Sequence, residues 1–141
     1  MALDYTLVIP TYNRPQLLHK LVDYYHRRSQ GLKLLVLDSS REAVMRENAL
    51  VLGKYGDLVQ HVVYPDTEQV GVKLYKGLQL VRTRYVSFCA DDDLVFPQGI
   101  ADAVNFLEVN PDHVCAHGLY LNYRLDEDYP QDVDLWREYG G

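Results

Sequence analysis

Three adjacent carboxylates, Asp91, Asp92 and Asp93, are the most chemically distinctive residues of this sequence, and they directly follow the apolar run 85–89. Negative charges crowded at the end of a buried strand repel one another unless a cation or hydrogen-bond donors compensate them. Carboxylate oxygens suit Mg²⁺ or Mn²⁺, and a site with one or two carboxylates leaves coordination positions for phosphate oxygens. The triplet therefore favours a metal–diphosphate site over the alternative, a solvated acidic turn before Pro97.

A fourth carboxylate, Asp38, follows the apolar run 32–37. At the end of a strand it can accept hydrogen bonds from a base or a ribose. The alternative is that Asp38, Ser39 or Ser40 caps the next helix, and the sequence leaves both interpretations open. The chain has neither G-x-G-x-x-G after its first strand nor a P-loop, so a metal and side chains would have to hold any bound phosphates.

These residues need a scaffold, and the hydrophobic pattern supplies one of alternating strands and helices. Strands are predicted at 5–9, 32–37, 58–63, 85–89 and 113–119, the last with a continuation to 123 left open. Helices are predicted from 15 to about 25, at 42–54, from 67 or 71 to 82, and at 98–109. We expect Pro10 to end the first strand and Asn13 to cap the first helix. The alternation predicts an α/β fold with a doubly wound, mostly parallel sheet, which gathers the polar residues along one rim.

Composition, net charge and the cysteine count restrict the classes of protein to which this chain can belong. The chain has 141 residues, 48% of them hydrophobic, so we expect one folded α/β domain over 1–125, followed by an acidic segment over 126–141. A net charge of −6 with scattered basic residues argues against nucleic acid as a partner. No signal peptide or apolar run of about 20 residues is present, so we expect a cytoplasmic chain with no membrane span. Cys89 and Cys115 are expected to be apolar core residues in a reducing compartment.

Three motifs in order carry a family resemblance: residues 8–15 (VIPTYNRP), 35–40 (LVLDSS) and 88–93 (FCADDD), the last followed by Pro97. Together they resemble the nucleotide-binding half of a GT-A glycosyltransferase of the family 2 type, from residue 5 to about 119. The resemblance implies a nucleotide-diphosphate sugar as donor, with a UDP-sugar favoured, and Mg²⁺ or Mn²⁺ as cofactor.

The resemblance also assigns roles to individual residues. It implies that Thr11 and Tyr12 border the base, that Asp38 recognises its ring, and that Asp93 is the principal metal ligand, with Asp91 as a second. The full set implied for the nucleotide-sugar site is Pro10, Thr11, Tyr12, Arg14, Asp38, Lys73, Lys76, Asp91 and Asp92.

Two departures from the family pattern affect these assignments. Relatives often carry two acidic residues where this chain has only Asp38 followed by serines, which leaves base recognition less defined. Relatives commonly carry Ala-Arg-Asn before a glycine, whereas residues 71–77 are GVKLYKG. Lys73 or Lys76 is the candidate basic contact there, and the alternative is that both lysines only solvate a helix.

The resemblance further implies an acceptor-binding segment with a carboxylate general base, expected beyond Gly141, because residues 126–128 fall too early. We therefore expect the donor-binding part of a longer enzyme, whose cut sheet edge is open to self-association. A non-catalytic nucleotide-sugar-binding or interaction module and a nucleotidyltransferase remain as alternatives. A phosphoacceptor signalling domain is disfavoured, since no lysine follows Lys76.

Overall fold

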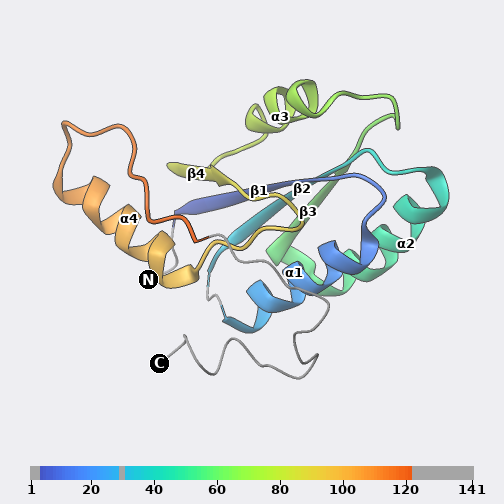
Figure 1. Cartoon of the computed structure of the whole chain (residues 1–141), viewed down its shortest axis with the longest axis horizontal. Coiled ribbons are helices and arrows are strands. Elements are labelled where there is room, and N and C mark those ends of the chain that lie inside the picture. The colour runs from blue at the N-terminus through green and yellow to red at the C-terminus, as the bar shows by residue number, and fades with distance from the viewer. Residues whose placement is uncertain (1–3, 29–30, 122–141) are drawn as a thin grey trace.

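The computed structural model describes residues 4–28 and 31–121 of the chain. Figure 1 shows its helices and strands. In chain order these elements are β1 (Tyr5–Thr11), α1 (Pro15–Arg28), β2 (Lys33–Asp38), α2 (Glu42–Leu52), the 3₁₀ helix η1 (Gly53–Leu58), β3 (Val59–Val63), α3 (Val70–Leu78), β4 (Tyr85–Phe88) and α4 (Pro97–Val109).

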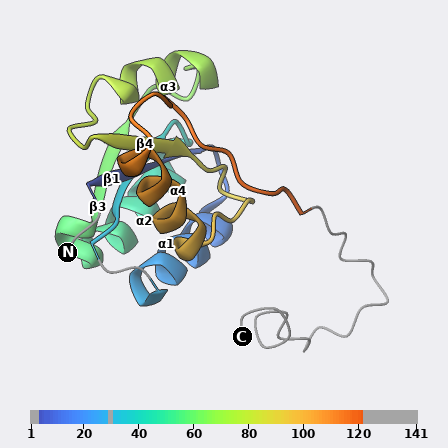
Figure 2. The same cartoon turned by 90° about the vertical axis from the view of Figure 1, so that its left-hand side faces the viewer.

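The four strands of the described residues form one parallel sheet in the order β3-β2-β1-β4. Helices α1, α2 and α4 pack on one face, where Leu7 and Ile9 of β1 meet Leu18 and Val22 of α1. Helix α3 covers the opposite face over a smaller cluster, as Figures 1 and 2 show. The predicted doubly wound α/β fold is confirmed. Because β2 and β4 lie on opposite sides of β1, the strand order reverses between β1 and β4.

Pro10 does not end β1, contrary to the expectation from sequence. The strand continues to Thr11, and Pro10 lies opposite Leu37 in the ladder with β2. The Val8 carbonyl accepts the Cys89 N–H on the β4 side, and in a parallel ladder Pro10 faces the same side as Val8. The ladder with β4 ends at Val8, so the missing N–H of Pro10 costs no strand hydrogen bond.

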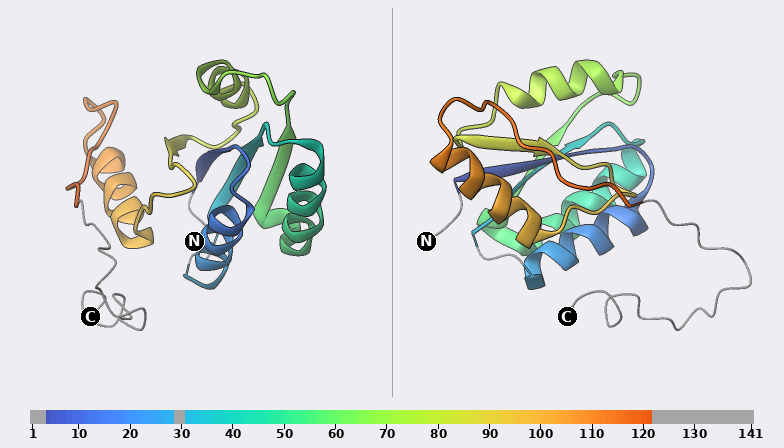
Figure 3. Two further views of the ribbon diagram at one scale, coloured as in Figure 1. Left: turned by 45° about the vertical axis from the view of Figure 1, so that its right-hand side comes forward. Right: turned by 60° about the vertical axis from the view of Figure 1, so that its left-hand side comes forward.

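The predicted fifth strand at 113–119 is wrong. Residues 114–121 form no strand or helix, and Val114 and Leu119 are almost fully exposed. Among the described residues β4 pairs only with β1, and residues 113–121 do not pair with its free outer edge. The apolar run had predicted a buried strand, but a strand needs a paired neighbour as well as apolar side chains. Figure 3 shows α4 and residues 110–121 beyond the β4 edge. Part of the open continuation to 123, and the whole segment 126–141, lie outside the described residues.

A charged contact ties α4 to the start of β4. The Arg84 guanidinium lies 2.9 Å from the Glu108 carboxylate, and the Tyr85 hydroxyl donates to the same carboxylate at 2.9 Å. Ile100 and Val104 of α4 are buried in the core beneath the sheet. These contacts fix α4 relative to β4 and the core, and the loop that joins β4 to α4 contains the acidic triplet.

Candidate functional site

The carboxyl ends of β1, β2 and β4 meet at one rim, as predicted. Thr11 lies opposite Asp38 in the ladder between β1 and β2, and the Ser39 N–H donates to the Thr11 carbonyl at 3.3 Å. The Thr11 hydroxyl donates to Asp91 Oδ2 at 2.7 Å. Thr11 therefore links Asp38 on β2 to the acidic triplet after β4, at the point where the strand order reverses.

The carboxylates of Asp91 and Asp92 have a cation of their own. Nη1 of Arg14 lies 3.2 Å from Asp91 Oδ1 and 2.7 Å from Asp92 Oδ2. The hydrogen bond to Asp92 and the charge of Asp91 raise the pKa of the Arg14 guanidinium above its usual value. Asp91 is buried and Asp92 is exposed. The charge crowding that suggested a metal is thus compensated for these two residues by Arg14 and Thr11.

Asp93 is the available carboxylate of the triplet. It is exposed, its N–H donates to the Ala90 carbonyl at 3.1 Å, and among the described residues its carboxylate has no hydrogen-bond or ion-pair partner. In residues 4–28 and 31–121 no group of three acidic, histidine or cysteine side chains is arranged to hold a metal. One free carboxylate with carboxylate oxygens beside it suits a Mg²⁺ or Mn²⁺ ion that takes its remaining ligands from phosphates and water. The residues therefore fit a metal–diphosphate pair better than an ion alone.

A buried tyrosine supports the loop behind the triplet. The Tyr25 hydroxyl, on α1, donates to the Val95 carbonyl at 2.9 Å and accepts the Val95 N–H at 3.1 Å. Burial raises the pKa of Tyr25 far above its usual value, so the hydroxyl stays protonated. The triplet is fixed on one side by Thr11 and on the other by this contact.

Asp38 is fully buried, and both of its carboxylate oxygens are occupied. Oδ1 accepts the Ser40 N–H at 2.8 Å, while Oδ2 accepts Asn48 Nδ2 at 2.8 Å and His61 Nε2 at 3.0 Å. Burial alone would raise the pKa of Asp38, but the bonds from His61, Ser40 and Asn48 outweigh it and lower the pKa to about 2. Asn48 also lies 2.9 Å from His19 Nε2. Asp38 thus joins two helices and two strands beneath the rim.

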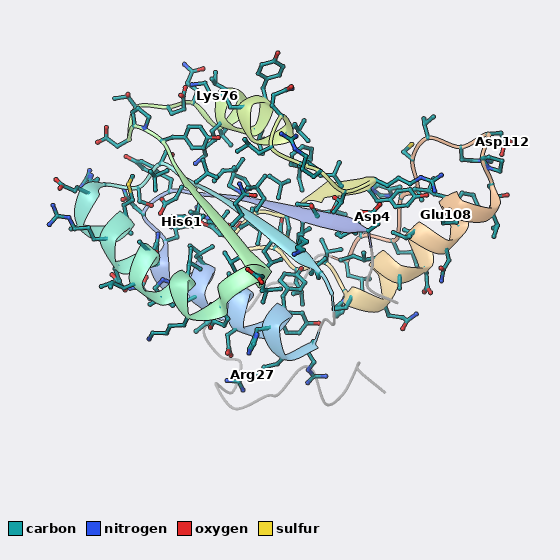
Figure 4. All side chains as sticks on the ribbon, turned by 180° about the vertical axis from the view of Figure 1, so that it is seen from behind. Asp4, Arg27, His61, Lys76, Glu108 and Asp112 are labelled. Carbon is teal, nitrogen blue, oxygen red and sulfur yellow. The ribbon has the colours of Figure 1, made fainter. Side chains whose placement is uncertain are left out.

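His61 and Asn48 were not among the predicted site residues. Figure 4 shows His61 on the α2 side of β3, while Lys76 lies on α3, across the sheet. A histidine in a strand is usually a structural residue with a satisfied hydrogen bond, and His61 fits that description through its bond to Asp38. Asn48, in the middle of α2, gave no signal, because its partner is ten residues earlier on another element.

Asn13 does not cap α1, and no side chain of the 38–40 segment caps α2. The backbone of Asn13 has a φ of 54°, a left-handed conformation that asparagine tolerates. Its N–H donates to Ser40 Oγ at 2.9 Å, and its Oδ1 accepts the Arg41 N–H at 2.9 Å. Arg14 takes the N-cap position of α1, since its carbonyl accepts the Leu18 N–H. Asn13 therefore fastens the loop after β1 to the loop after β2, while Arg14 is directed to the triplet.

The two candidate lysines have different environments. Lys73 is buried, and its Nζ donates to the Thr11 carbonyl and to Ser39 Oγ, both at 2.7 Å. Burial lowers the pKa of Lys73, although the charges of Asp38 and Asp91 oppose this. Lys76 instead pairs with Glu68 and lies 5.8 Å from the centre of the Tyr64 ring. Lys73 therefore lies at the rim, whereas the partners of Lys76 come from the segment between β3 and α3.

Tyr12 is predicted to border the base, and the two cysteines are predicted to be core residues. Tyr12 follows Thr11 and is 47% exposed, so its ring is accessible to a ligand. Cys89 precedes the triplet by two residues and is buried as expected, with burial raising the pKa of its thiol to about 11. Cys115 is exposed, contrary to the expectation of a core position, because it lies on the segment that forms no strand.

In the described part of the chain no helix is both long enough and apolar enough to cross a bilayer. Residues 6–139 match the sequence model of glycosyl transferase family 2. No curated protein gives a significant match to the chain.

Solved structures share the fold. The mannosyltransferase PcManGT from Pyrobaculum calidifontis, in complex with GDP-Man and Mn²⁺, superposes with a TM-score of 0.63 at 23% identity, over 76% of this chain and 33% of that one. TarS 1–349 from S. aureus gives a TM-score of 0.63 at 17% identity, over 77% of this chain and 33% of that one. A second structure of S. aureus TarS gives a TM-score of 0.60 at 18% identity, over 79% of this chain and 20% of that one. The chain thus spans a third or less of the length of these structures.

Proposed function

The chain belongs to glycosyl transferase family 2, and from this we propose that it binds a nucleotide-diphosphate sugar together with a divalent ion. In this proposal it forms the donor-binding part of an enzyme that transfers the sugar to an acceptor hydroxyl. The observation that supports it most is the acidic triplet at the reversal point between β1 and β4, with Asp91 fixed and Asp93 free. Ligands of open α/β sheets bind at such points.

Each part of the donor has a candidate contact. Tyr12 and the Pro10–Thr11 backbone would border the base, with Asp38 as acceptor for a base N–H. A carboxylate accepts about four hydrogen bonds and Asp38 accepts three, so one position remains, although the buried carboxylate must first be uncovered. Asp92 would lie toward the ribose and phosphates.

The metal would be held by Asp93, with Asp91 as the weaker candidate because Thr11 and Arg14 already bond its oxygens. A bound divalent ion would stabilise the negative charge that develops on the departing nucleoside diphosphate. The Mn²⁺ and GDP-Man in the mannosyltransferase structure support this choice of ligands. Mg²⁺ serves the same carboxylate chemistry.

In the complete reaction the acceptor oxygen would form a bond to the anomeric carbon on the face opposite the nucleoside diphosphate. The bond from that carbon to the phosphate oxygen breaks, its electron pair leaves with the nucleoside diphosphate, and the configuration inverts. The acceptor proton passes to a carboxylate acting as general base. We assign none of the described residues to that role and expect little or no transfer by the 141-residue chain.

Calorimetric titration tests donor binding. UDP, GDP, their sugars and the matching nucleoside monophosphates are titrated into the chain with Mn²⁺, with Mg²⁺ and with a chelator. We expect binding that requires the ion and the diphosphate, with UDP compounds favoured and GDP compounds as the alternative. If no nucleoside diphosphate binds in the presence of either ion, the proposal is wrong.

The Asp93→Asn variant tests the metal assignment. We expect it to weaken ion-dependent nucleotide binding by about a hundredfold, because even the outer partners of metal ligands contribute about 10–100-fold. The exposed Asp93 side chain has no hydrogen-bond or ion-pair partner among the described residues, so circular dichroism and the urea midpoint should match the wild type. Asp66→Asn, at another exposed loop aspartate, is the matched control and should bind normally. Unchanged ion dependence in Asp93→Asn would refute the assignment.

A further inference from the structure

The triplet is associated with two cations of different kinds. Lys73 is 3% exposed, and its two bonds, to the Thr11 carbonyl and Ser39 Oγ, hold it inside the rim. The Arg14 side chain is 51% exposed and reaches Asp91 and Asp92 from outside. A buried, bonded ammonium stays in place, whereas an exposed ion pair contributes little and exchanges easily with water and ions.

Arg14 uses only one corner of its guanidinium in these contacts. Both carboxylates are bound through Nη1, and in residues 4–28 and 31–121 neither Nη2 nor Nε has a hydrogen-bond partner. A guanidinium with free N–H groups is suited to bidentate binding of a phosphate. The residue therefore has an existing anionic partner and free donors for a second one.

We propose that Arg14 is a displaceable counter-ion of Asp91 and Asp92. Without a nucleotide, its positive charge opposes the entry of a free divalent ion. When ion and nucleotide bind together, the guanidinium leaves the two carboxylates and binds the diphosphate. This inference rests on the proposed function. It makes ion binding depend on the nucleotide, and by reciprocity nucleotide binding depends equally on the ion.

The expected effect follows from Coulomb's law. A divalent ion about 5 Å from a guanidinium, in a water-like dielectric with physiological salt, loses roughly fivefold in affinity through repulsion. Removing the guanidinium charge also frees carboxylate oxygens near the ion. Arg14→Gln should therefore bind Mn²⁺ alone about fivefold more tightly than the wild type.

The test is a Mn²⁺ titration of the 141-residue chain by calorimetry and by electron paramagnetic resonance of the free ion, with and without saturating UDP or GDP. Arg14→Gln is compared with Arg14→Lys and with Arg46→Gln. Arg46 is an exposed α2 arginine paired with Glu42, so its replacement removes the same charge far from any proposed contact. Circular dichroism checks the fold of every variant.

We expect tighter binding of Mn²⁺ alone in Arg14→Gln, near wild-type binding in Arg14→Lys and Arg46→Gln, and a smaller gain in Mn²⁺ affinity from the nucleotide in Arg14→Gln. The inference is overturned if Arg14→Gln binds Mn²⁺ no more tightly than Arg46→Gln, or if Arg14→Lys behaves like Arg14→Gln. If no nucleotide binds the wild type, the proposed function fails and the transfer to the diphosphate fails with it. The titrations with Mn²⁺ alone then still decide whether Arg14 competes with the ion.

Discussion

Replacement of Asp38 by asparagine is the change whose cost the structure defines best. The carboxylate accepts bonds from Ser40, Asn48 and His61, and no part of the residue is exposed. Asparagine keeps the shape but replaces one acceptor oxygen with an NH₂ group. That group cannot accept a bond, so at least one buried donor loses its partner.

The size of the loss follows from the lowered pKa. The interval between the ordinary value of 3.8 and about 2 corresponds to roughly 2 kcal/mol of stability at neutral pH. Loss of a bonded partner for a buried donor gives a similar figure, about 1–3 kcal/mol. Because the folded-state pKa is depressed, this stability is present above the unfolded-state pKa near 3.8 and is lost as the pH falls through about 2.

The assay is urea unfolding of the wild type and Asp38→Asn at pH 7, 5 and 3, followed by circular dichroism. We expect the variant to unfold with about 2 kcal/mol less free energy at pH 7, and this difference to fall to about half at pH 3. Asp66→Asn, an exposed loop change, should cost less than about 0.5 kcal/mol at every pH. A difference below about 0.5 kcal/mol at pH 7, or one that is equal at pH 7 and pH 3, would refute the reasoning.

Two further predictions concern the packing of α3 and the accessibility of the thiols. A Cβ on Gly77 would lie 2.4 Å from a methyl group of the buried Leu37, so Gly77→Ala should lower the free energy of unfolding by about 1–3 kcal/mol in the urea assay. The control is Gly71→Ala, in the same helix with open space around it, which should be neutral or stabilising in the same assay. Exposed Cys115 should react with a thiol reagent in the native chain, and buried Cys89 only after unfolding; two fast thiols in the native state would contradict the burial of Cys89.

The sequence was sufficient for the sheet wherever an apolar run meets a neighbouring strand. β2 and β3 were located to within a residue because each run is followed by a polar turn and each strand pairs in register with its neighbour. The same rule places Thr11, Asp38 and Asp91 at one rim, since the carboxyl ends of parallel strands share an edge. Local pattern and topology agree for these residues.

The sequence was insufficient wherever an outcome depends on a partner far along the chain. Residues 113–119 have a strand-like composition, yet they form no strand, because no neighbour pairs with them among the described residues. Asparagine is a common helix cap, but the Asn13 backbone N–H donates to Ser40 and the Asn13 side chain accepts the Arg41 N–H instead. His61 and Asn48 converge on Asp38 only after β2, β3 and α2 have packed together.

The acidic triplet shows why a charge pattern alone does not determine a metal site. Adjacent carboxylates require compensation, and the sequence does not reveal whether an ion or a side chain supplies it. Here Arg14, which follows the left-handed turn at Asn13, supplies it for Asp91 and Asp92 and leaves Asp93 uncompensated. In the proposed function, such a site is expected to bind an ion alone weakly and to bind more tightly an ion that arrives with additional negative charge. The local electrostatics therefore favour an ion–diphosphate complex over either component alone, which is the property that the Mn²⁺ and nucleotide titrations measure.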